Sequence, residues 1–422
     1  MNRRVVITGM GCLTPVGNDV ETTWQNLLDG ISGIDYAKRF DAATFPSKIL
    51  GEVKGFEPPA CSENLLKYAN RSHQLAIAAG LMAIADACLD MTAIDPVDVG
   101  VSVGVCGNYP DLEQLRYYFS FGGDDGWDHQ AFAKKARISP TLVFRRSTQT
   151  LSCLLAKHLK VFGPNMTSQT ACASGAHAIG QAFRIIRRGD AKVMITGGTD
   201  AIENPILFSG FALLGALSTR NVEPQKASRP FDAQRDGFIH AEGAGMLVLE
   251  ALDSALERGA PIYAEIGGCG TSSNAFRVTD FPLDGAGPKL SMERALADAA
   301  IRPCNIDYIN AHGTSTTQND ISETVAIKKL FGDYAYEIPI SSIKSCIGHL
   351  VSGAGAVEAI ITALTVKEDR IPPTINHEHP DPQCDLDYVP NEMRKKPVNH
   401  ALSNSFGFGG QSTCLAINKF VG

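Results

Sequence analysis

Short apolar runs rich in β-branched residues alternate along this chain with longer segments in which apolar positions recur at helical spacing. Residues 99–105 and 192–196 follow the first pattern and predict buried strands. Residues 291–300 and 323–331 follow the second pattern and predict amphipathic helices. Because such alternation is typical of a mostly parallel sheet with helices on both faces, the pattern predicts an α/β protein.

Three pairs of short segments resemble one another and occur in the same order in the two halves of the chain. They are 7–11 with 266–270, 97–104 with 306–313, and 174–179 with 352–357. Their order predicts an internal duplication, with halves of roughly 1–255 and 256–422. No linker rich in proline, glycine or serine separates the halves. We therefore expect them to pack as one unit in α/β/α/β/α layers, which resembles the thiolase fold.

Composition narrows the possible functions. The formal net charge of -7 over 422 residues argues against general binding of nucleic acids or membrane surfaces. No stretch is apolar for long enough to span a membrane, and the apolar run after Arg4 breaks at Gly9, too soon for a signal peptide. We expect a cytoplasmic protein. The cysteines have no zinc-ligand spacing, and residues 377–379 lie in a polar loop flanked by prolines, so we expect no metal site.

Three distant segments place a reactive side chain among small residues and glycines. They are 170–175 with Cys172, 310–316 with His312, and 344–349 with Lys344 and His349, and a glycine-rich run at 404–410 follows them. A thiol with two imidazoles is what an acyltransferase needs when it must also stabilise a carbanion. Cys172 begins a helical run, 171–187, and a helix N-terminus favours the thiolate, which is the nucleophile. If the two halves are related by a pseudo-twofold axis, the helix after His349 starts beside Cys172.

With these segments in this order, the chain resembles a β-ketoacyl-acyl-carrier-protein synthase over essentially its whole length, and most closely the elongating type II enzymes. The resemblance implies that the acylated nucleophile is Cys172 and that His312 and His349 bind the malonyl thioester, with Lys344 as the active-site lysine. It also implies that Thr314, Thr316 and Phe406 contact substrate and that Phe408 gates the acyl site. No cofactor is expected beyond the phosphopantetheine arm of an acyl carrier protein. The expected partners are that carrier and a second chain, in a homodimer or a heterodimer.

The chemistry of condensation fits these roles. Loss of CO2 from malonyl leaves an enolate, and two imidazole N–H donors in a dry pocket can stabilise its oxygen. Tetrahedral intermediates on the acyl-cysteine need a second oxyanion hole, for which the backbone N–H groups of Cys172 and Phe408 are the natural donors. We expect Asp320, Glu323 and Glu358 either to order the histidines and Lys344 or to serve as a helix cap and a solvated face.

Several departures from the fatty-acid pattern bear on the substrate. Gly107 stands where a bulky isoleucine is usual in the acyl pocket, Gly215 replaces an arginine that contacts the carrier, and residues 144–149 are unusually polar. These departures favour the ketosynthase subunit of a type II polyketide or polyene pathway. The alternatives are housekeeping fatty-acid elongation and, in a different class, a non-catalytic partner subunit, although such relatives lose the cysteine.

An acidic carrier protein calls for a basic rim near the tunnel mouth. The candidates for this rim are Lys67, Arg71, Lys134, Lys135 and Arg137. The alternative interpretation of these residues is solvated charge without a partner.

Overall fold

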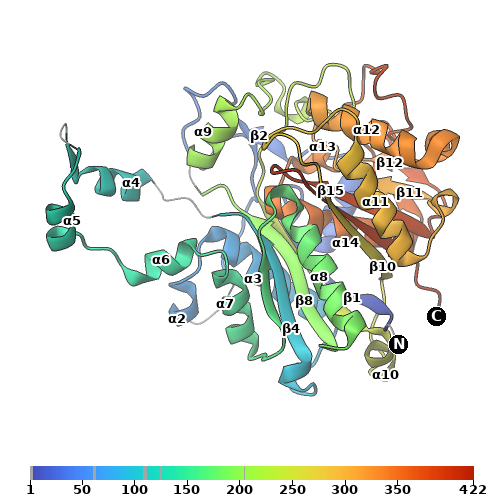
Figure 1. The fold of residues 1–422 in the computed structure, drawn as a ribbon, viewed down its shortest axis with the longest axis horizontal. Helices are drawn as coiled ribbons and strands as arrows, with labels where there is room; N and C mark the ends of the chain where they lie inside the picture. The colour runs from blue at the N-terminus through green and yellow to red at the C-terminus, as the bar shows by residue number, and fades with distance from the viewer. Residues whose placement is uncertain (1–2, 60–62, 108–111, 124–125, 204) are drawn as a thin grey trace.

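The computed structural model describes residues 3–59, 63–107, 112–123, 126–203 and 205–422. One large sheet runs through the molecule, with strand order β12-β11-β15-β16-β10-β1-β9-β8-β4-β7 (Figure 1). The strands of the N-terminal half are β1 (Val5–Leu13), β4 (Val99–Val105), β7 (Asn165–Ser168), β8 (Val193–Asp200) and β9 (Gly243–Ala251). Those of the C-terminal half are β10 (Ala264–Ser273), β11 (Tyr308–Asn310), β12 (Ile340–Ser341), β15 (His400–Phe406) and β16 (Gln411–Asn418).

The two halves have the same strand order, which supports the duplication predicted from the repeats. Numbered within its own half, each set of strands runs 3-2-4-5-1, and only the fifth strand, β9 or β16, opposes the others. A β-bulge lies between Ile7 and Gly9 in β1, and another lies at the matching place between Ile266 and Gly268 in β10. The halves join where β1 pairs antiparallel with β10.

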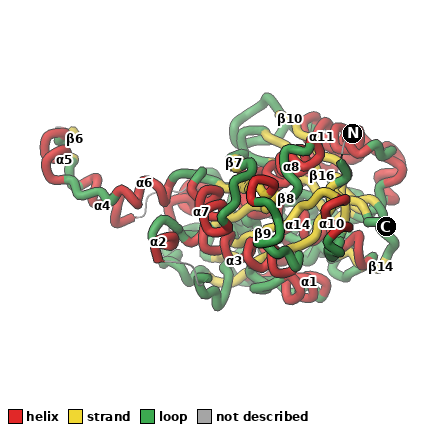
Figure 2. Tube along the Cα trace, turned by 90° about the horizontal axis from the view of Figure 1, so that it is seen from below, coloured by secondary structure: helices red, strands yellow, loops and turns green. Residues whose placement is uncertain are grey.

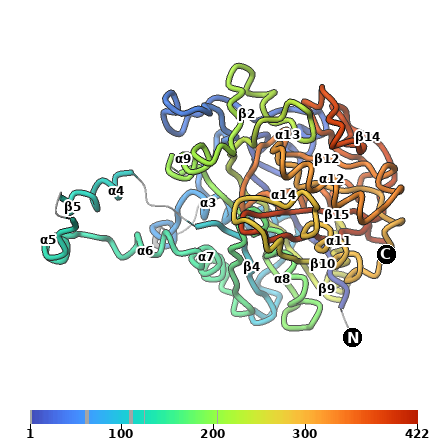
Figure 3. The backbone as a smooth tube through the Cα atoms, turned by 45° about the horizontal axis from the view of Figure 1, so that its top comes forward, coloured from blue at the N-terminus to red at the C-terminus, as the bar shows by residue number. Residues whose placement is uncertain are grey.

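The helices form three layers, and the two five-stranded parts of the sheet lie between them, which gives five layers in all. The central layer is α8 (Ser174–Arg188) with α14 (Ala354–Glu368), and each contacts strands from both halves. The outer layers are α3 (Arg71–Asp86) with α7 (Thr150–Leu159), and α11 (Ala286–Ala299) with α12 (Thr317–Phe331). In Figure 3 the C-terminal half, orange to red, packs directly against the N-terminal half. The layered thiolase-like fold expected from the sequence is therefore confirmed.

The hydrophobic pattern explains why these elements form. Every residue of β1, β4, β8 and β9 is buried, because helices cover both faces of the sheet. Helix α3 starts at a capping box between Asn70 and His73, and α8 ends at Gly189 in the left-handed conformation that glycine favours. Among the described residues, no helix is both long and apolar enough to cross a bilayer.

One part of the molecule projects from the body (Figures 1 and 2). We call it the arm; it comprises α4 (Leu112–Phe119), the hairpin of β5 (Gly122–Gly123) and β6 (Gly126–Trp127), α5 (His129–Lys135) and α6 (Pro140–Arg146). The remaining elements are α1 (Val20–Leu28), α2 (Glu63–Leu66), α9 (Pro205–Leu213), α10 (Leu252–Glu257), α13 (Lys344–Ile347), and the hairpins β2 (Ile34–Tyr36) with β3 (Ile49–Gly51) and β13 (Arg370–Ile371) with β14 (Arg394–Lys395).

The register of one predicted repeat is wrong. The structure pairs 3-10 turns at 171–173 and 351–353, and the helices that follow start at Ser174 and Ala354. A side chain on Gly175 would meet Ala356, and one on Gly355 would meet Ala176, so Gly175 and Gly355 are the equivalent positions. The sequence match had placed Gly175 against Gly353, two residues away. Runs of alanine, glycine and serine fit either register, so similarity could not decide between them.

Candidate active site

Turns at the starts of the two central helices bring the predicted residues together. Cys172 lies in the 3-10 turn before α8, and His349 lies just before the corresponding turn of α14. A cavity of about 320 Å³ is lined by Cys172, His312, His349, Phe406 and Phe408, together with Thr314 and Thr316. The pseudo-twofold arrangement of the halves thus places one thiol and two imidazoles around one space.

Hydrogen bonds fix both imidazoles in one tautomer. The backbone N–H of Val351 donates to His349 Nδ1 at 3.2 Å, and Lys344 Nζ lies 3.4 Å from His312 Nδ1 and acts as the donor. A neutral ring that accepts at Nδ1 carries its proton on Nε2. Burial, followed by the nearby charge of Lys344, holds the pKa of both His312 and His349 well below 6.5, so both rings are neutral. With ring centroids 5.4 Å apart, the two histidines offer a pair of Nε2–H donors.

Lys344 and Glu358 form a buried ion pair behind the histidines. Lys344 starts the short helix α13 and Glu358 lies one turn into α14, and each side chain is only 1% exposed. Burial raises the pKa of Glu358, while Lys344 opposes that rise. Of the two interpretations left open for Glu358, the pairing with Lys344 is the one the structure has.

Glu323 and Asp320 are also buried, so neither lies on a solvated face. Glu323 accepts hydrogen bonds from the backbone N–H groups of His312 and Gly313, both at 2.9 Å, and from Asn404 at 3.0 Å. Burial raises the pKa of Glu323 to about 7, although these donors favour its charged form. Asp320 accepts from the backbone N–H of Thr314 at 3.0 Å. The two carboxylates therefore hold the backbone of the loop that carries His312 and the threonines.

The environment of Cys172 differs from the expectation of a stabilised thiolate. Burial raises the pKa of the thiol to about 11, and the charge of Lys344 and the backbone N–H groups of Phe408 and Cys172 only partly oppose this. Desolvation outweighs the helix N-terminus because the side chain is almost completely enclosed. The same two backbone N–H groups face the sulfur, where the second oxyanion hole was predicted.

The glycine-rich run packs directly on the nucleophile's turn. A side chain on Gly407 would come within 2.6 Å of the carbonyl oxygen of Thr170 and 3.2 Å of the backbone nitrogen of Cys172. Only a residue without a Cβ allows this approach, which sets the amide of Phe408 beside the sulfur. The rings of Phe408 and Phe211 meet edge to face at 6.4 Å.

Of the other residues singled out from the sequence, Gly215 lines the cavity, whereas Gly107 and the docking candidates do not. Gly107 follows β4 and does not line the cavity, although among the described residues a side chain there would meet just the amide of Gln169, at 3.6 Å. The exposed candidates for carrier docking are Lys67 beside α2 and Lys134, Lys135 and Arg137 on the arm. Arg71 does not suit docking, because its side chain is 17% exposed and binds the fully buried Glu242 through two hydrogen bonds.

Sequence reasoning missed several residues that line or support the cavity. Asp236, Phe238, Thr279 and Phe281 line it beside the predicted residues. The signal that could have found two of them is the run 229–238, where four charged residues stand among glycine, proline and phenylalanine. Among the residues that the structure describes, no cluster of histidine, cysteine and carboxylate side chains could hold a metal ion.

Comparison with known proteins identifies the family of this chain. Residues 2–255 match the profile of the beta-ketoacyl synthase N-terminal domain, and residues 263–378 match that of the C-terminal domain. The chain is 43% identical to a 3-oxoacyl-[acyl-carrier-protein] synthase 2 of Synechocystis, over 99% of this chain and 98% of that protein. It is 42% identical to the protein of the same name from Staphylococcus aureus, over 99% of each chain.

Solved structures with the same fold include ketosynthases, one of them from a type II polyketide synthase. One, in the complex AntDE:AntF with its acyl-carrier protein and a bound hexaketide, has a TM-score of 0.87 and 35% identity, with both chains covered completely. The ishigamide ketosynthase/chain length factor has a TM-score of 0.88 and 33% identity, again with complete coverage of both chains. The chain described here thus belongs to the β-ketoacyl synthase family and is a carbon–carbon bond-forming acyltransferase, a β-ketoacyl-acyl-carrier-protein synthase.

Proposed function

We propose that this enzyme condenses an acyl chain held on Cys172 with malonyl on the phosphopantetheine arm of an acyl carrier protein, with loss of CO2. The observation that carries the proposal is the pair of neutral imidazoles, each with its proton on Nε2, in the cavity that Cys172 lines. Neutral N–H donors stabilise a developing enolate oxygen without losing their own protons. A metal ion or a redox cofactor has no part in this proposal.

Two bond-forming steps follow. In the first, the sulfur of Cys172 attacks the acyl thioester, the bond to the carrier sulfur breaks, and the thiol proton of Cys172 ends on the released carrier thiol. In the second, malonyl loses CO2, and the enolate carbon attacks the acyl-cysteine carbonyl. Cys172 then leaves, giving a β-ketoacyl carrier two carbons longer. Because the pKa of Cys172 is raised to about 11, the first step requires deprotonation as the thioester arrives.

For the acyl chain, we propose the saturated intermediates of fatty-acid elongation. The support is relative similarity, because two relatives named 3-oxoacyl-[acyl-carrier-protein] synthase 2 are 43% and 42% identical to this chain, whereas the ketosynthase of a type II polyketide synthase is 35% identical. The polyketide or polyene role that the sequence departures favoured thus becomes the second candidate. One observation still favours it, since among the described residues a side chain on Gly107 would meet no atom closer than the amide of Gln169, at 3.6 Å.

A substrate panel separates these candidates. The purified enzyme is loaded with saturated acyl carriers or with β-keto and polyene acyl carriers of equal length, and condensation with malonyl carrier is measured as kcat/KM. Saturated elongation predicts the higher value for the saturated series. A clear preference for the β-keto or polyene series would overturn the fatty-acid proposal.

We propose that the arm packs against a second ketosynthase-like chain. None of the described residues in α4, α5 and α6 is buried, and Phe119, Val143 and Phe144 are all more than half exposed. Exposed apolar groups of this kind are typical of protein interfaces. Val143→Asp should lower the mass measured by light scattering to that of one chain. Val222→Asp, at an exposed position outside the arm, should leave it unchanged. A dimer that persists in the Val143 variant would count against this interface.

We further propose that Lys67, Lys134, Lys135 and Arg137 contribute to docking of the acidic carrier. All four are exposed. Residues 129–189 contain no aspartate or glutamate, so the part of the arm from α5 onward and the segment after it are basic in a chain of net charge -7, whereas Glu113 and Asp128 lie earlier in the arm. Reversing the charges at Lys134 and Lys135 should raise KM for the carrier-bound substrate. Lys395→Glu, an exposed site on β14, is the matched control. An unchanged KM in the double reversal would exclude docking there.

A further inference from the structure

The loop 312–317 carries His312, Thr314 and Thr316, and buried charge supports it from behind. Asp320, in the first turn of α12, accepts hydrogen bonds from the backbone N–H groups of Thr314 at 3.0 Å and Phe231 at 2.9 Å. The hydroxyls of Thr314 and Thr316 lie 2.8 Å apart, so the position of one constrains the other. One carboxylate therefore joins the cavity loop to the segment 229–238.

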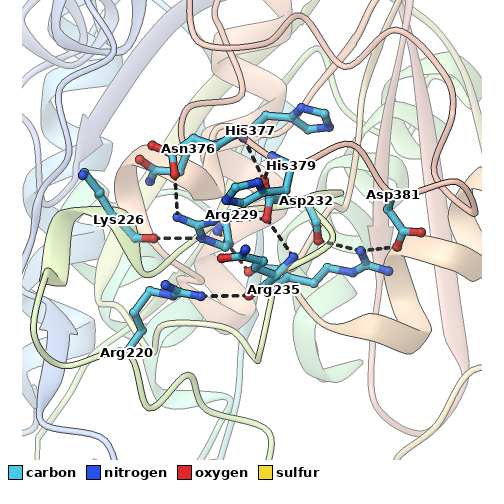
Figure 4. A network of polar contacts seen from close by, with 12 residues as sticks. Arg220, Lys226, Arg229, Asp232, Arg235, Asn376, His377, His379 and Asp381 are labelled. Atoms are coloured by element: carbon cyan, nitrogen blue, oxygen red, sulfur yellow. Dashed lines mark hydrogen bonds and ion pairs between the residues drawn. The ribbon is translucent and has the colours of Figure 1, made fainter.

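Arg235 completes the support with a side chain that is only 1% exposed. Its Nε lies 3.6 Å from Asp320 Oδ2, and one terminal nitrogen donates to both the Asp232 carbonyl oxygen and Asp381, each at 2.7 Å. The other terminal nitrogen donates to the carbonyl oxygen of Thr317 at 3.4 Å. Figure 4 shows Arg235 reaching toward Asp381 within this network. The guanidinium of Arg235 thus contacts both Asp320, which binds the backbone of Thr314, and the carbonyl oxygen of Thr317 at the end of the loop.

The network continues behind Arg235. The carboxylate of Asp232 accepts from Arg229 and from the backbone N–H groups of Glu378 and His379 (Figure 4), and these N–H donors lower its pKa against the effect of burial. The backbone N–H of Arg229 donates to Ser315 Oγ, and that of Gly237 donates to the Ser315 carbonyl oxygen. The residues 377–379, which resemble a metal motif, thus anchor this network instead.

Because its charges lose their hydration when they are buried, a network of this kind adds little to the stability of the fold. Burying paired charges costs much of what their attraction returns, so apolar residues of similar volume often stabilise a fold as well. What the network fixes is geometry, because the terminal nitrogens of Arg235 donate to Asp232, Asp381 and Thr317 along set directions that a lysine does not reproduce.

We propose that Arg235 and Asp320 are positioning residues that set the 312–317 loop so that Thr314 and Thr316 meet the incoming pantetheine arm. This inference rests on the proposed condensation with carrier-bound malonyl. The contact chain runs from Arg235 to Asp320, from Asp320 to the backbone of Thr314, and from Thr314 to Thr316. Asp236 and Gly237, directly after Arg235, line the same cavity, so the segment that holds the loop also forms part of its wall.

A merely structural role predicts a different result from a positioning role. Misplacing a binding group by about 1 Å can cost about a hundredfold in rate, even when the fold is intact. Arg235→Lys keeps the positive charge but removes the planar guanidinium with its fixed N–H donors. We expect a rise in KM for malonyl carrier of about tenfold or more. Alkylation of Cys172 by iodoacetamide, which needs no pantetheine arm, should keep its rate.

The test is a double-mutant cycle that combines Arg235→Lys with Thr314→Ala and Thr316→Ala. If Arg235 acts through the threonines, its effect on KM should largely vanish once they are removed. Arg258→Lys is the matched control, because Arg258 forks onto the fully buried Glu250 away from the cavity, and it should leave KM unchanged. Asp320→Asn repeats the cycle from the other partner if Arg235→Lys folds poorly.

Additive effects in both cycles, or a KM that Arg258→Lys raises equally, would overturn the positioning role. Failure of the proposed function gives a different result, since the unaltered enzyme would then not condense malonyl carrier at all.

Discussion

Replacing Lys344 by methionine should destabilise the enzyme in a way that depends on pH. The substitution leaves the Glu358 carboxylate buried without its cation, because Lys344 binds Oε1 and Oε2 has no hydrogen-bond partner among the described residues. Removing one member of a buried pair typically costs about 3–5 kcal/mol. The variant can limit this loss by protonating Glu358, starting from an ordinary pKa of 4.5. At about 1.36 kcal/mol per pH unit, that limit is about 3 kcal/mol at pH 7 and about 1.4 kcal/mol at pH 5.5.

Urea unfolding of the Lys344→Met variant at these two pH values tests the size of the loss. Adding Glu358→Gln should recover most of the free energy of unfolding, because no charge then remains buried. Malonyl decarboxylation, measured as CO2 release, should stay low in the double variant, because His312 Nδ1 has lost its donor. As a control, Lys289→Met disrupts a half-exposed pair on α11 and should change the free energy by less than about 0.5 kcal/mol. An equal loss at both pH values, or recovered decarboxylation in the double variant, would refute this reasoning.

Two further predictions concern Asp200 and Gly407. Burial raises the pKa of Asp200 to about 7 from 3.8, so between these values the folded state binds more protons than the unfolded state. The contribution of Asp200 to stability should therefore fall as pH rises from about 4 to about 7, and Asp200→Asn should remove this contribution from the slope measured by urea unfolding. An unchanged slope would contradict a neutral Asp200. Gly407→Ala should push the Phe408 amide away from Cys172 and slow acylation about a hundredfold, as loss of one oxyanion donor does. Gly210→Ala, where a side chain meets no atom within 4 Å, is the control, and equal acylation rates for the two variants would exclude the close approach.

The sequence was sufficient for features set by local chemistry and by repetition. Strand β4 was predicted with its observed bounds, because valine recurs at every second position from Val99 to Val105, and β-branched residues favour a strand. The nearness of Cys172 and His349 was predicted from the duplication, because a pseudo-twofold axis can bring two equivalent helix starts to one cavity. His312 was added by the resemblance to the family. Both predictions depend on patterns that any residue-by-residue inspection can find.

Features that depend on burial and long-range pairing were not accessible in the same way. The thiol pKa of Cys172 depends on how completely the surrounding segments enclose the side chain. The position at a helix N-terminus had predicted a lowered pKa, whereas burial raises it. Arg71 has the positive charge expected of a docking residue, but its side chain binds Glu242, which lies 171 positions away in the sequence. The Arg235–Asp320 pair likewise joins residues 85 positions apart (320 minus 235), and only the fold brings them together.

The most direct test of the central claim follows both carbon and sulfur in one experiment. The enzyme is first acylated by an acyl carrier and then given malonyl carrier labelled with 13C in its free carboxyl group, and intact-mass and peptide spectra are recorded before and after. The proposed chemistry predicts an acyl mass on the peptide containing Cys172, its disappearance after malonyl is added, and release of the label as CO2. An acyl group on any other residue, or a condensed product that retains the label, would contradict it.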